Sequence, residues 1–198
     1  MSARLVLATR NEGKVAELRR ILDGLDVELL SARDVDLPDV EETGETFEDN
    51  ALLKARESAR ACGLPCVSDD SGLVVDALGG EPGVRSARYA GPHGDDEANL
   101  RLVLARMEGV ADRAARFVCV AALALPDGRE RTVRGELEGM LTEAPRGSGG
   151  FGYDPIFLPL GERRTTAEMP PEDKDAISHR GKAFRALRPA VAELLGLG

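Results

Sequence analysis

The sequence contains little of what several classes of protein require. Its 198 residues include no tryptophan, seven other aromatic residues and three cysteines. The longest unbroken apolar run, 117–125, has nine residues, against about 20 for a membrane-spanning helix. The N-terminus lacks the apolar stretch of a secretory signal, and a sparse, odd number of cysteines argues against a disulfide framework. The sequence therefore predicts a soluble cytoplasmic protein with no membrane partner.

Positive charge is also scarce. Lys and Arg number 26 against 35 Asp and Glu, which gives a net charge of -9. Nucleic-acid binders present a basic surface, so we expect no nucleic-acid partner. A small phosphorylated ligand is not excluded, because it needs only a local basic pocket, with or without a metal ion. With 42% hydrophobic and 31% charged residues the composition is that of a globular protein, and the length suits one domain with up to two lobes.

Apolar periodicity and turn residues predict alternating strands and helices. Residues 69–72 (DDSG) are expected to form a turn, and a Pro-Asp-Gly turn at 126–128 joins the two longest strands as a hairpin. Mixed strands and helices with one hairpin predict an α/β fold with a mixed sheet, and 1–198 is expected to be a single domain. Strands are expected at 4–9, 26–32, 65–68, 73–77, 117–125 and 129–141, and helices at 12–22, 47–61, 95–108 and from 172 onward, with a break near Ser178 and a kink or restart at Pro189.

The first candidate ligand site is the segment 9–14 (TRNEGK), between a strand and a helix. Asn11 suits the helix N-cap, so Lys14 falls in the first turn, where a cation opposes the helix dipole. A bound phosphate would reverse that argument, since the amides and Lys14 would converge on one anion. The alternative is an ordinary capped helix with an exposed lysine. His179 and Arg180 crowd the start of the last helix in the same way, as a second anion contact or a solvated basic turn.

Adjacent carboxylates, Asp69 and Asp70, follow a buried strand. Such a pair can hold a hard divalent cation and orient a water molecule. Neighbouring strand residues point to opposite faces, so only one of the two is expected in the site. The alternative is an Asx turn closed by Gly72. The acidic loop around Glu41 and Glu42 could supply a further metal ligand or form a solvated face.

The glycine-rich loop 147–155 (GSGGFGYDP) contains two of the few aromatic residues, Phe151 and Tyr153. Glycine lets the backbone approach a ligand closely, and an aromatic ring presented there can stack on a nucleobase. The alternative is a hairpin corner whose rings fill the core. Arg85, Arg88 and Tyr89 could line a cleft, support the Asp70 segment or lie at a dimer interface.

Six motifs occur in order across nearly the whole chain: TRNEGK, VEETGETFEDNALLKA, VSDDSGL, GGEPGVRSARYAG, GSGGFGYDPIF and ISHRGKA. In this order they resemble the inosine/xanthosine triphosphate pyrophosphatase family. The resemblance implies a homodimer of α/β subunits, each with a long mixed sheet flanked by helices and two lobes around a central cleft. It implies Mg²⁺-dependent hydrolysis of XTP, ITP and dITP to the nucleoside monophosphate and pyrophosphate, which keeps damaged purines out of DNA and RNA.

The resemblance also assigns roles to residues. Asp70 would be the general base, and Asp70 with Glu41 would bind Mg²⁺. Phe151 would stack on the base, and His179 and Arg180 would face the purine. The full set of substrate-binding residues would be Thr9, Arg10, Asn11, Glu12, Gly13 and Lys14 at the triphosphate, Ser71 beside the substrate, Phe151, Gly152, Tyr153 and Asp154 in the base-binding loop, and Lys174, His179 and Arg180.

The same residues also suit two other functions. One is a related pyrophosphatase that prefers modified pyrimidine nucleotides, and the other is a nucleotide-binding module that senses a triphosphate without cleaving it. The loop around Phe151 and the turn at His179 favour purines with an oxygen at C6. Asp70, Glu41 and Lys14 argue against a pure sensor, which needs no base.

Overall fold

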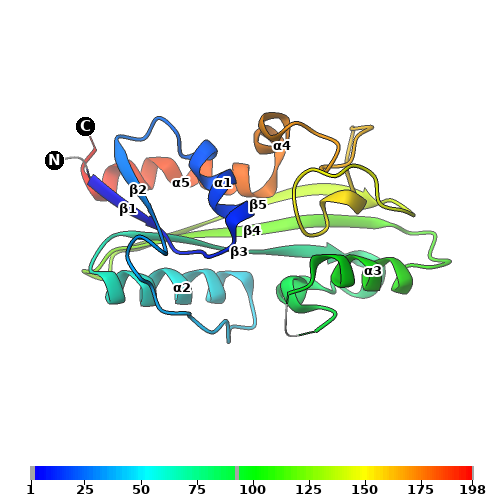
Figure 1. Cartoon of the computed structure of the whole chain (residues 1–198), viewed down its shortest axis with the longest axis horizontal. Helices are drawn as coiled ribbons and strands as arrows, with labels where there is room; N and C mark the ends of the chain where they lie inside the picture. Colours follow the sequence, from blue (N-terminus) through cyan, green and yellow to red (C-terminus); the bar gives the residue numbers. More distant parts are fainter. Residues whose placement is uncertain (1–2, 92–93, 198) are drawn as a thin grey trace. The chain divides into compact units, whose positions relative to one another are not determined.

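The computed structural model describes residues 3–91 and 94–197 (Figure 1). Six strands of this part of the chain form one sheet in the order β2-β1-β3-β4-β5-β6. β1 pairs in parallel with β2 and β3, whereas β5 pairs antiparallel with β6, which confirms the predicted mixed sheet. The strands are β1 (Ala3–Leu7), β2 (Val27–Ser31), β3 (Cys66–Val75), β4 (Ala114–Ala124), β5 (Glu130–Leu141) and β6 (Phe157–Pro159).

The predicted helix caps are present. The Asn11 side chain accepts a hydrogen bond from the Lys14 amide and that of Thr46 from the Asp49 amide. Gly63 ends α2 at φ 68°, a conformation that glycine adopts without a Cβ clash. The helices described are α1 (Glu12–Ile21), α2 (Phe47–Cys62), α3 (Asp96–Arg106), α4 (Pro171–Ile177) and α5 (His179–Leu195, which continues through Pro189), with short 3-10 turns η1 (Asp76–Leu78), η2 (Gly83–Arg88) and η3 (Asp154–Ile156).

The chain divides into two compact units. Unit 1 comprises Met1–Asp70, Cys119–Gly135 and Arg180–Gly198, and unit 2 comprises Ser71–Val118 and Glu136–His179. In unit 1, α1 and α5 lie on one side of the strands and α2 on the other (Figure 1). The core under α1 and α5 includes Leu18, Phe184 and Leu187, and the core of unit 2 includes Leu73, Phe117 and Phe157. The central cleft stays a prediction, as does the assignment of 1–198 to one domain.

The structure also bears on two classes that the composition argues against. All three cysteines are free thiols, although the Sγ atoms of Cys62 and Cys66 lie only 3.5 Å apart. In the described ranges, no helix combines the length and the apolar character needed to cross a membrane.

The turn predicted at residues 69–72 is wrong, because β3 runs without interruption from Cys66 to Val75. Adjacent aspartates favour turns when water solvates them. Here Asp69 and Asp70 are both buried in the strand, and each carboxylate has protein partners on its own face of the sheet. Because these partners take the place of water, the two carboxylates do not favour a turn here.

Gly72 allows a close contact within unit 2. Ser86 Oγ accepts a hydrogen bond from the Leu73 amide at 2.9 Å and donates one to the Gly83 carbonyl at 2.7 Å. A Cβ atom at Gly72 would overlap both the Gly83 carbonyl oxygen and Ser86 Oγ. The VSDDSGL motif therefore packs, at Gly72, against Gly83 and Ser86 of the later GGEPGVRSARYAG motif.

We expect Gly72→Ala to lower the free energy of unfolding by about 3 kcal/mol, because a backbone oxygen cannot move aside cheaply. The control is Gly79→Ala, at φ +65° with no atom within 4 Å, which should cost only the backbone strain of about 1 kcal/mol. Urea unfolding measures both. A loss for Gly72→Ala no greater than that of the control would contradict this packing.

Candidate active site

The segment after β1 is shaped by its own side chains. Thr9 Oγ1 accepts a hydrogen bond from the Asn11 amide at 3.2 Å, and Asn11 Oδ1 accepts one from the Lys14 amide at 3.0 Å. β1 and β3 run parallel, with Leu7 opposite Val67, so the segment that follows β1 lies beside the residues that follow Val67 in β3. This pairing brings Lys14 to the aspartates of β3.

Four side chains of unit 1, which we call the Asp69 cluster, form a buried set of ion pairs. Asp69 Oδ2 lies 3.0 Å from Lys14 Nζ and accepts hydrogen bonds from Arg180 Nη2 and Nε at 3.2 and 3.3 Å. Arg180 Nη1 donates to Glu17 Oε2 at 2.5 Å. The Asp69 side chain is 0% exposed and that of Lys14 16%. The cluster thus joins α1 and α5 to β3.

The charges of the Asp69 cluster keep the Asp69 carboxylate ionised. Burial alone would raise the pKa of Asp69, but Lys14 and Arg180 outweigh it and hold that pKa well below its ordinary value. Burial would lower the pKa of Arg180, and the facing carboxylates of Asp69 and Glu17 raise it instead. Asp69 is therefore a poor proton acceptor.

Asp70 lies on the opposite face of β3, towards α2. Its Oδ2 accepts a hydrogen bond from Asn50 Nδ2 at 3.0 Å. Lys54 Nζ donates to Glu42 Oε1 and to the Asp69 carbonyl oxygen, both at 2.6 Å. Burial raises the pKa of Asp70 to about 6; Glu42 adds to this rise and Lys54 opposes it. A carboxylate with that pKa can accept a proton at neutral pH, as a general base must.

The carboxylates near Asp70 fit a hard divalent cation. Carboxylate oxygens suit Mg²⁺, which keeps several waters and needs only one or two such ligands. Burial disfavours the negative charge of the ionised Asp70 carboxylate, and a bound cation would offset that charge. Glu42 is half-buried beside Lys54, whereas Glu41 is exposed in the loop. No cluster of three or more His, Cys, Asp or Glu side chains able to hold a metal occurs in the described part of the chain.

In unit 2, Asp154 organises the glycine-rich loop. Its carboxylate accepts hydrogen bonds from the Phe151 amide at 2.9 Å and from Thr166 Oγ1 at 2.8 Å, and it pairs with Lys174 Nζ. A Cβ atom at Gly150 would overlap this carboxylate. Asp154 is 3% exposed, so it holds the loop together from inside.

The two aromatic residues of this loop differ in their surroundings. Tyr153 is buried and its hydroxyl donates to the Ser86 carbonyl at 2.7 Å, so it belongs to the core of unit 2. Phe151 is partly exposed, and Lys174 Nζ lies 4.9 Å from the centre of its ring. The Gly152 amide donates to Asp96 Oδ2 at 2.9 Å. Tyr153 therefore fills the core, as one sequence alternative has it, whereas the stacking of Phe151 on a base stays a prediction.

His179 and Arg180 are adjacent but have different partners. The His179 ring stacks on Phe117 within unit 2, with centroids 4.7 Å apart and planes at 16°. Arg180 belongs to the Asp69 cluster of unit 1. That both side chains face a purine stays a prediction, and for Arg180 the structure gives Asp69 and Glu17 as partners.

Two charged residues of the TRNEGK segment, Arg10 and Glu12, have partners other than those of Lys14. Arg10 bonds to the Leu37 carbonyl at 2.6 Å and pairs with Asp39 at 3.1 Å, and Glu12 pairs with Arg33 at 3.0 Å. Gly13 lies in the first turn of α1, and Ser71 follows Asp70 directly in β3.

Tyr89 supports unit 2 from inside. It is 8% exposed, its hydroxyl donates to Glu81 Oε2 at 2.9 Å, and Arg106 of α3 contacts both groups.

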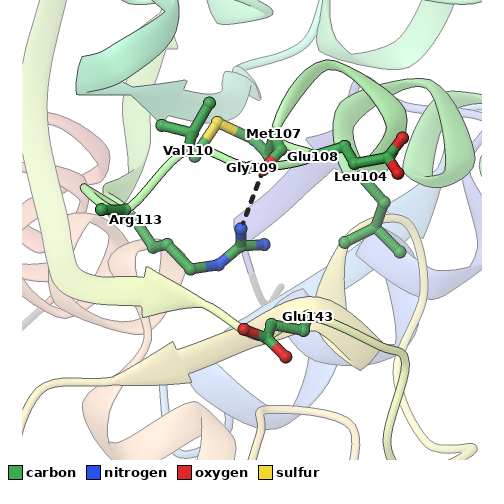
Figure 2. Close-up of a pocket in the computed structure, with 8 residues that line it drawn as sticks. Leu104, Met107, Glu108, Gly109, Val110, Arg113 and Glu143 are labelled. Carbon is green, nitrogen blue, oxygen red and sulfur yellow. Dashed lines mark hydrogen bonds between the residues drawn. The ribbon is translucent and has the colours of Figure 1, made fainter.

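A cavity of about 540 Å³ in unit 2 contains none of the predicted residues (Figure 2). Arg113 in its wall donates to the Met107 carbonyl at 3.1 Å and to the Leu141 and Thr142 carbonyls, each at 2.8 Å. This guanidinium braces the backbone, so the cavity is not a candidate active site. Its lining residues are Leu104, Met107, Glu108, Gly109, Val110, Ala111, Arg113 and Glu143.

Sequence reasoning missed three residues near the two aspartates: Glu17, Asn50 and Lys54. A signal for two of them exists in α2. Asn50 and Lys54 are four residues apart, hence on one side of the helix, next to buried alanines such as Ala51 and Ala55. Polar residues on a buried alanine-rich face need partners, which here are Asp70, Glu42 and the Asp69 carbonyl.

The comparisons with known proteins agree with this fold. Residues 5–190 match the model of the Ham1 family, and the chain belongs to that family. A dITP/XTP pyrophosphatase of Streptomyces coelicolor is 62% identical, over 98% of this chain and 99% of the relative. One of Symbiobacterium thermophilum is 54% identical, over 98% of each. The solved structure of a HAM1 protein from Coxiella burnetii superposes with a TM-score of 0.87 at 42% identity, covering 96% of this chain and 99% of the other.

We expect Asp70→Asn to stabilise the metal-free protein at neutral pH. A carboxyl group whose folded-state pKa is raised contributes stability that is present at low pH and lost as pH rises through the folded pKa, here about 6. At pH 8 the asparagine variant should therefore be more stable by about 1–3 kcal/mol. At pH 4 the difference should be small. Urea unfolding in the presence of a chelator measures both values, and a difference that does not change with pH would contradict the assignment.

Proposed function

We propose that this chain hydrolyses XTP, ITP and dITP to the nucleoside monophosphate and pyrophosphate, and so keeps these nucleotides out of DNA and RNA. The relatives named dITP/XTP pyrophosphatase support this activity. The observation that carries it is the opposite shift in pKa of the two buried aspartates. Asp69 is held ionised by Lys14 and Arg180, while Asp70, on the other face, has a pKa raised to about 6.

The proposed reaction uses Asp70 as the general base. Asp70 accepts a proton from a water molecule, and the water oxygen forms a bond to the α phosphorus. The bond from that phosphorus to the α–β bridging oxygen breaks, and pyrophosphate leaves with this oxygen. Lys14 and Lys54 offset the charge that grows on the phosphate oxygens, which is the main requirement of such a displacement.

We propose Mg²⁺ as the cofactor, held by Asp70 and Glu41, with Glu42 as a second carboxylate on the same loop. When bound, the ion supplies charge neutralisation on the triphosphate. The net charge of -9 opposes the approach of a triphosphate, so local cations must compensate. The cations Lys14, Lys54 and Arg180 already face the carboxylates of Asp69, Asp70, Glu42 and Glu17, so a metal ion would add the missing positive charge.

Base recognition is assigned to unit 2 and the start of α5. Phe151, partly exposed and backed by Lys174, is the ring on which a purine would stack. ITP and XTP carry an oxygen at C6 where ATP carries an amino group, so a donor such as His179 or Arg180 would meet another donor in ATP. Sites that depend on such a bond reject the mismatched analogue by up to about 10⁴–10⁵-fold. The homodimer and the cytoplasmic location are proposed with this function.

The test is pyrophosphate release with Mg²⁺ from ITP, XTP, dITP, GTP, ATP and modified pyrimidine triphosphates. We expect release from the first three, little from GTP and ATP, and a loss of at least about 10²-fold in Asp70→Asn, as is usual when a general base is removed. Asp127→Asn is the matched control, because Asp127 is an exposed turn residue paired with Arg129, and it should retain full activity.

Three results would overturn the proposal. Preference for the pyrimidine triphosphates would change the substrate class. Tight binding of a triphosphate without release of pyrophosphate would indicate a sensor. Unchanged turnover in Asp70→Asn would remove Asp70 from the mechanism.

A further inference from the structure

We propose that Asp69 is a positioning residue that acts through Lys14. Its carboxylate fixes the Lys14 ammonium group at the start of α1, where that group meets the phosphates. This inference rests on the proposed function for the identity of the ligand, but the contacts that carry it lie wholly within unit 1.

Lys14 needs such an anchor. A lysine side chain has four rotatable bonds, and holding it in one place on ligand binding costs conformational entropy. Its ammonium group has three N–H donors, so one bond to Asp69 at 3.0 Å leaves others for phosphate oxygens. The side chain is 16% exposed, which keeps its end accessible. Asp69 therefore pre-orders Lys14 without using up its donors.

Asp69 is itself immobilised. Two N–H groups of Arg180 donate to the Asp69 oxygen that also contacts Lys14. Arg180 is tied in turn to Glu17, which lies three residues after Lys14 on α1 and so on the same side of the helix. α1 is thus attached to β3 twice, directly by Lys14 and through Arg180 by Glu17. The ammonium position is fixed by both attachments.

The geometry separates this role from two others. Asp69 is not a second base, because its side chain is 0% exposed and faces away from Asp70. A role as a source of negative charge alone predicts the opposite effect, because removing a negative charge beside a fixed Lys14 would strengthen phosphate binding. Loss of positioning would weaken it, so the sign of the effect of Asp69→Asn distinguishes the two.

The experiment is a double-mutant cycle with wild type, Asp69→Asn, Lys14→Ala and the double variant, measured as kcat/KM for ITP with Mg²⁺. In the presence of Lys14 we expect Asp69→Asn to lower kcat/KM by about tenfold or more, with a rise in KM, a coupling typical of residues in contact. In the Lys14→Ala background the same substitution should change kcat/KM by no more than about twofold.

The controls address folding and general charge effects. Removing one partner of a buried ion pair is strongly destabilising, so each variant is first checked for a cooperative thermal transition. Asp69→Glu, which keeps the charge and displaces it by one methylene, replaces Asp69→Asn if the latter does not fold. Asp127→Asn, which removes an exposed paired carboxylate, should leave kcat/KM unchanged in both backgrounds.

The same cycle is measured on pyrophosphate binding by calorimetry, which needs no turnover. If wild type fails to cleave ITP, the proposed function fails, and the binding cycle still tests Asp69. Equal losses with and without Lys14 would show that Asp69 does not act through Lys14. Tighter pyrophosphate binding in Asp69→Asn would show a purely electrostatic role, and either result overturns the proposal.

Discussion

The pairing of the buried Asp69 carboxylate with Lys14 and Arg180 is the interaction on which the rest of unit 1 depends. An ionised carboxylate out of water is tolerated only with close partners, since its desolvation costs several kcal/mol. The partners come from α1 and α5, so satisfying one charge fixes two helices against β3. The same strand then presents Asp70 to the other face, where burial with weaker compensation gives it the raised pKa of a base.

Unit 2 also contains a buried aspartate that pairs with a lysine. Asp154 is buried, pairs with Lys174 and accepts the Phe151 amide. This carboxylate shapes the glycine-rich loop and places a lysine against the Phe151 ring. In each unit, then, a buried aspartate orders a lysine: Asp69 within strand β3 orders Lys14, and Asp154 in the glycine-rich loop orders Lys174. Arg180 and Lys174 are both predicted to bind substrate, yet Arg180 pairs with Asp69 and Glu17, whereas Lys174 pairs with Asp154.

Local signals in the sequence were sufficient for much of the fold. Asn11 and Thr46 begin α1 and α2, and Gly63 ends α2, as their chemistry predicts; the strands expected at 4–9, 117–125 and 129–141 correspond to β1, β4 and β5. The turn at 69–72 failed because the burial of Asp69 depends on Arg180, 111 positions away. Glu17, Asn50 and Lys54 were missed for the same reason, since their partners are distant in the chain. The site residues named by motif remain predictions, although Lys14, Asp70 and Phe151 have surroundings suited to their roles.

The most direct test of this account is a crystal structure of the Asp70→Asn variant with ITP and Mg²⁺, which should trap the uncleaved nucleotide. We expect Lys14 Nζ to contact both the Asp69 carboxylate and a phosphate oxygen, with Arg180 still bonded to Asp69 and Glu17. A triphosphate bound away from Lys14, or a Lys14 that leaves Asp69 to reach it, would contradict the central claim.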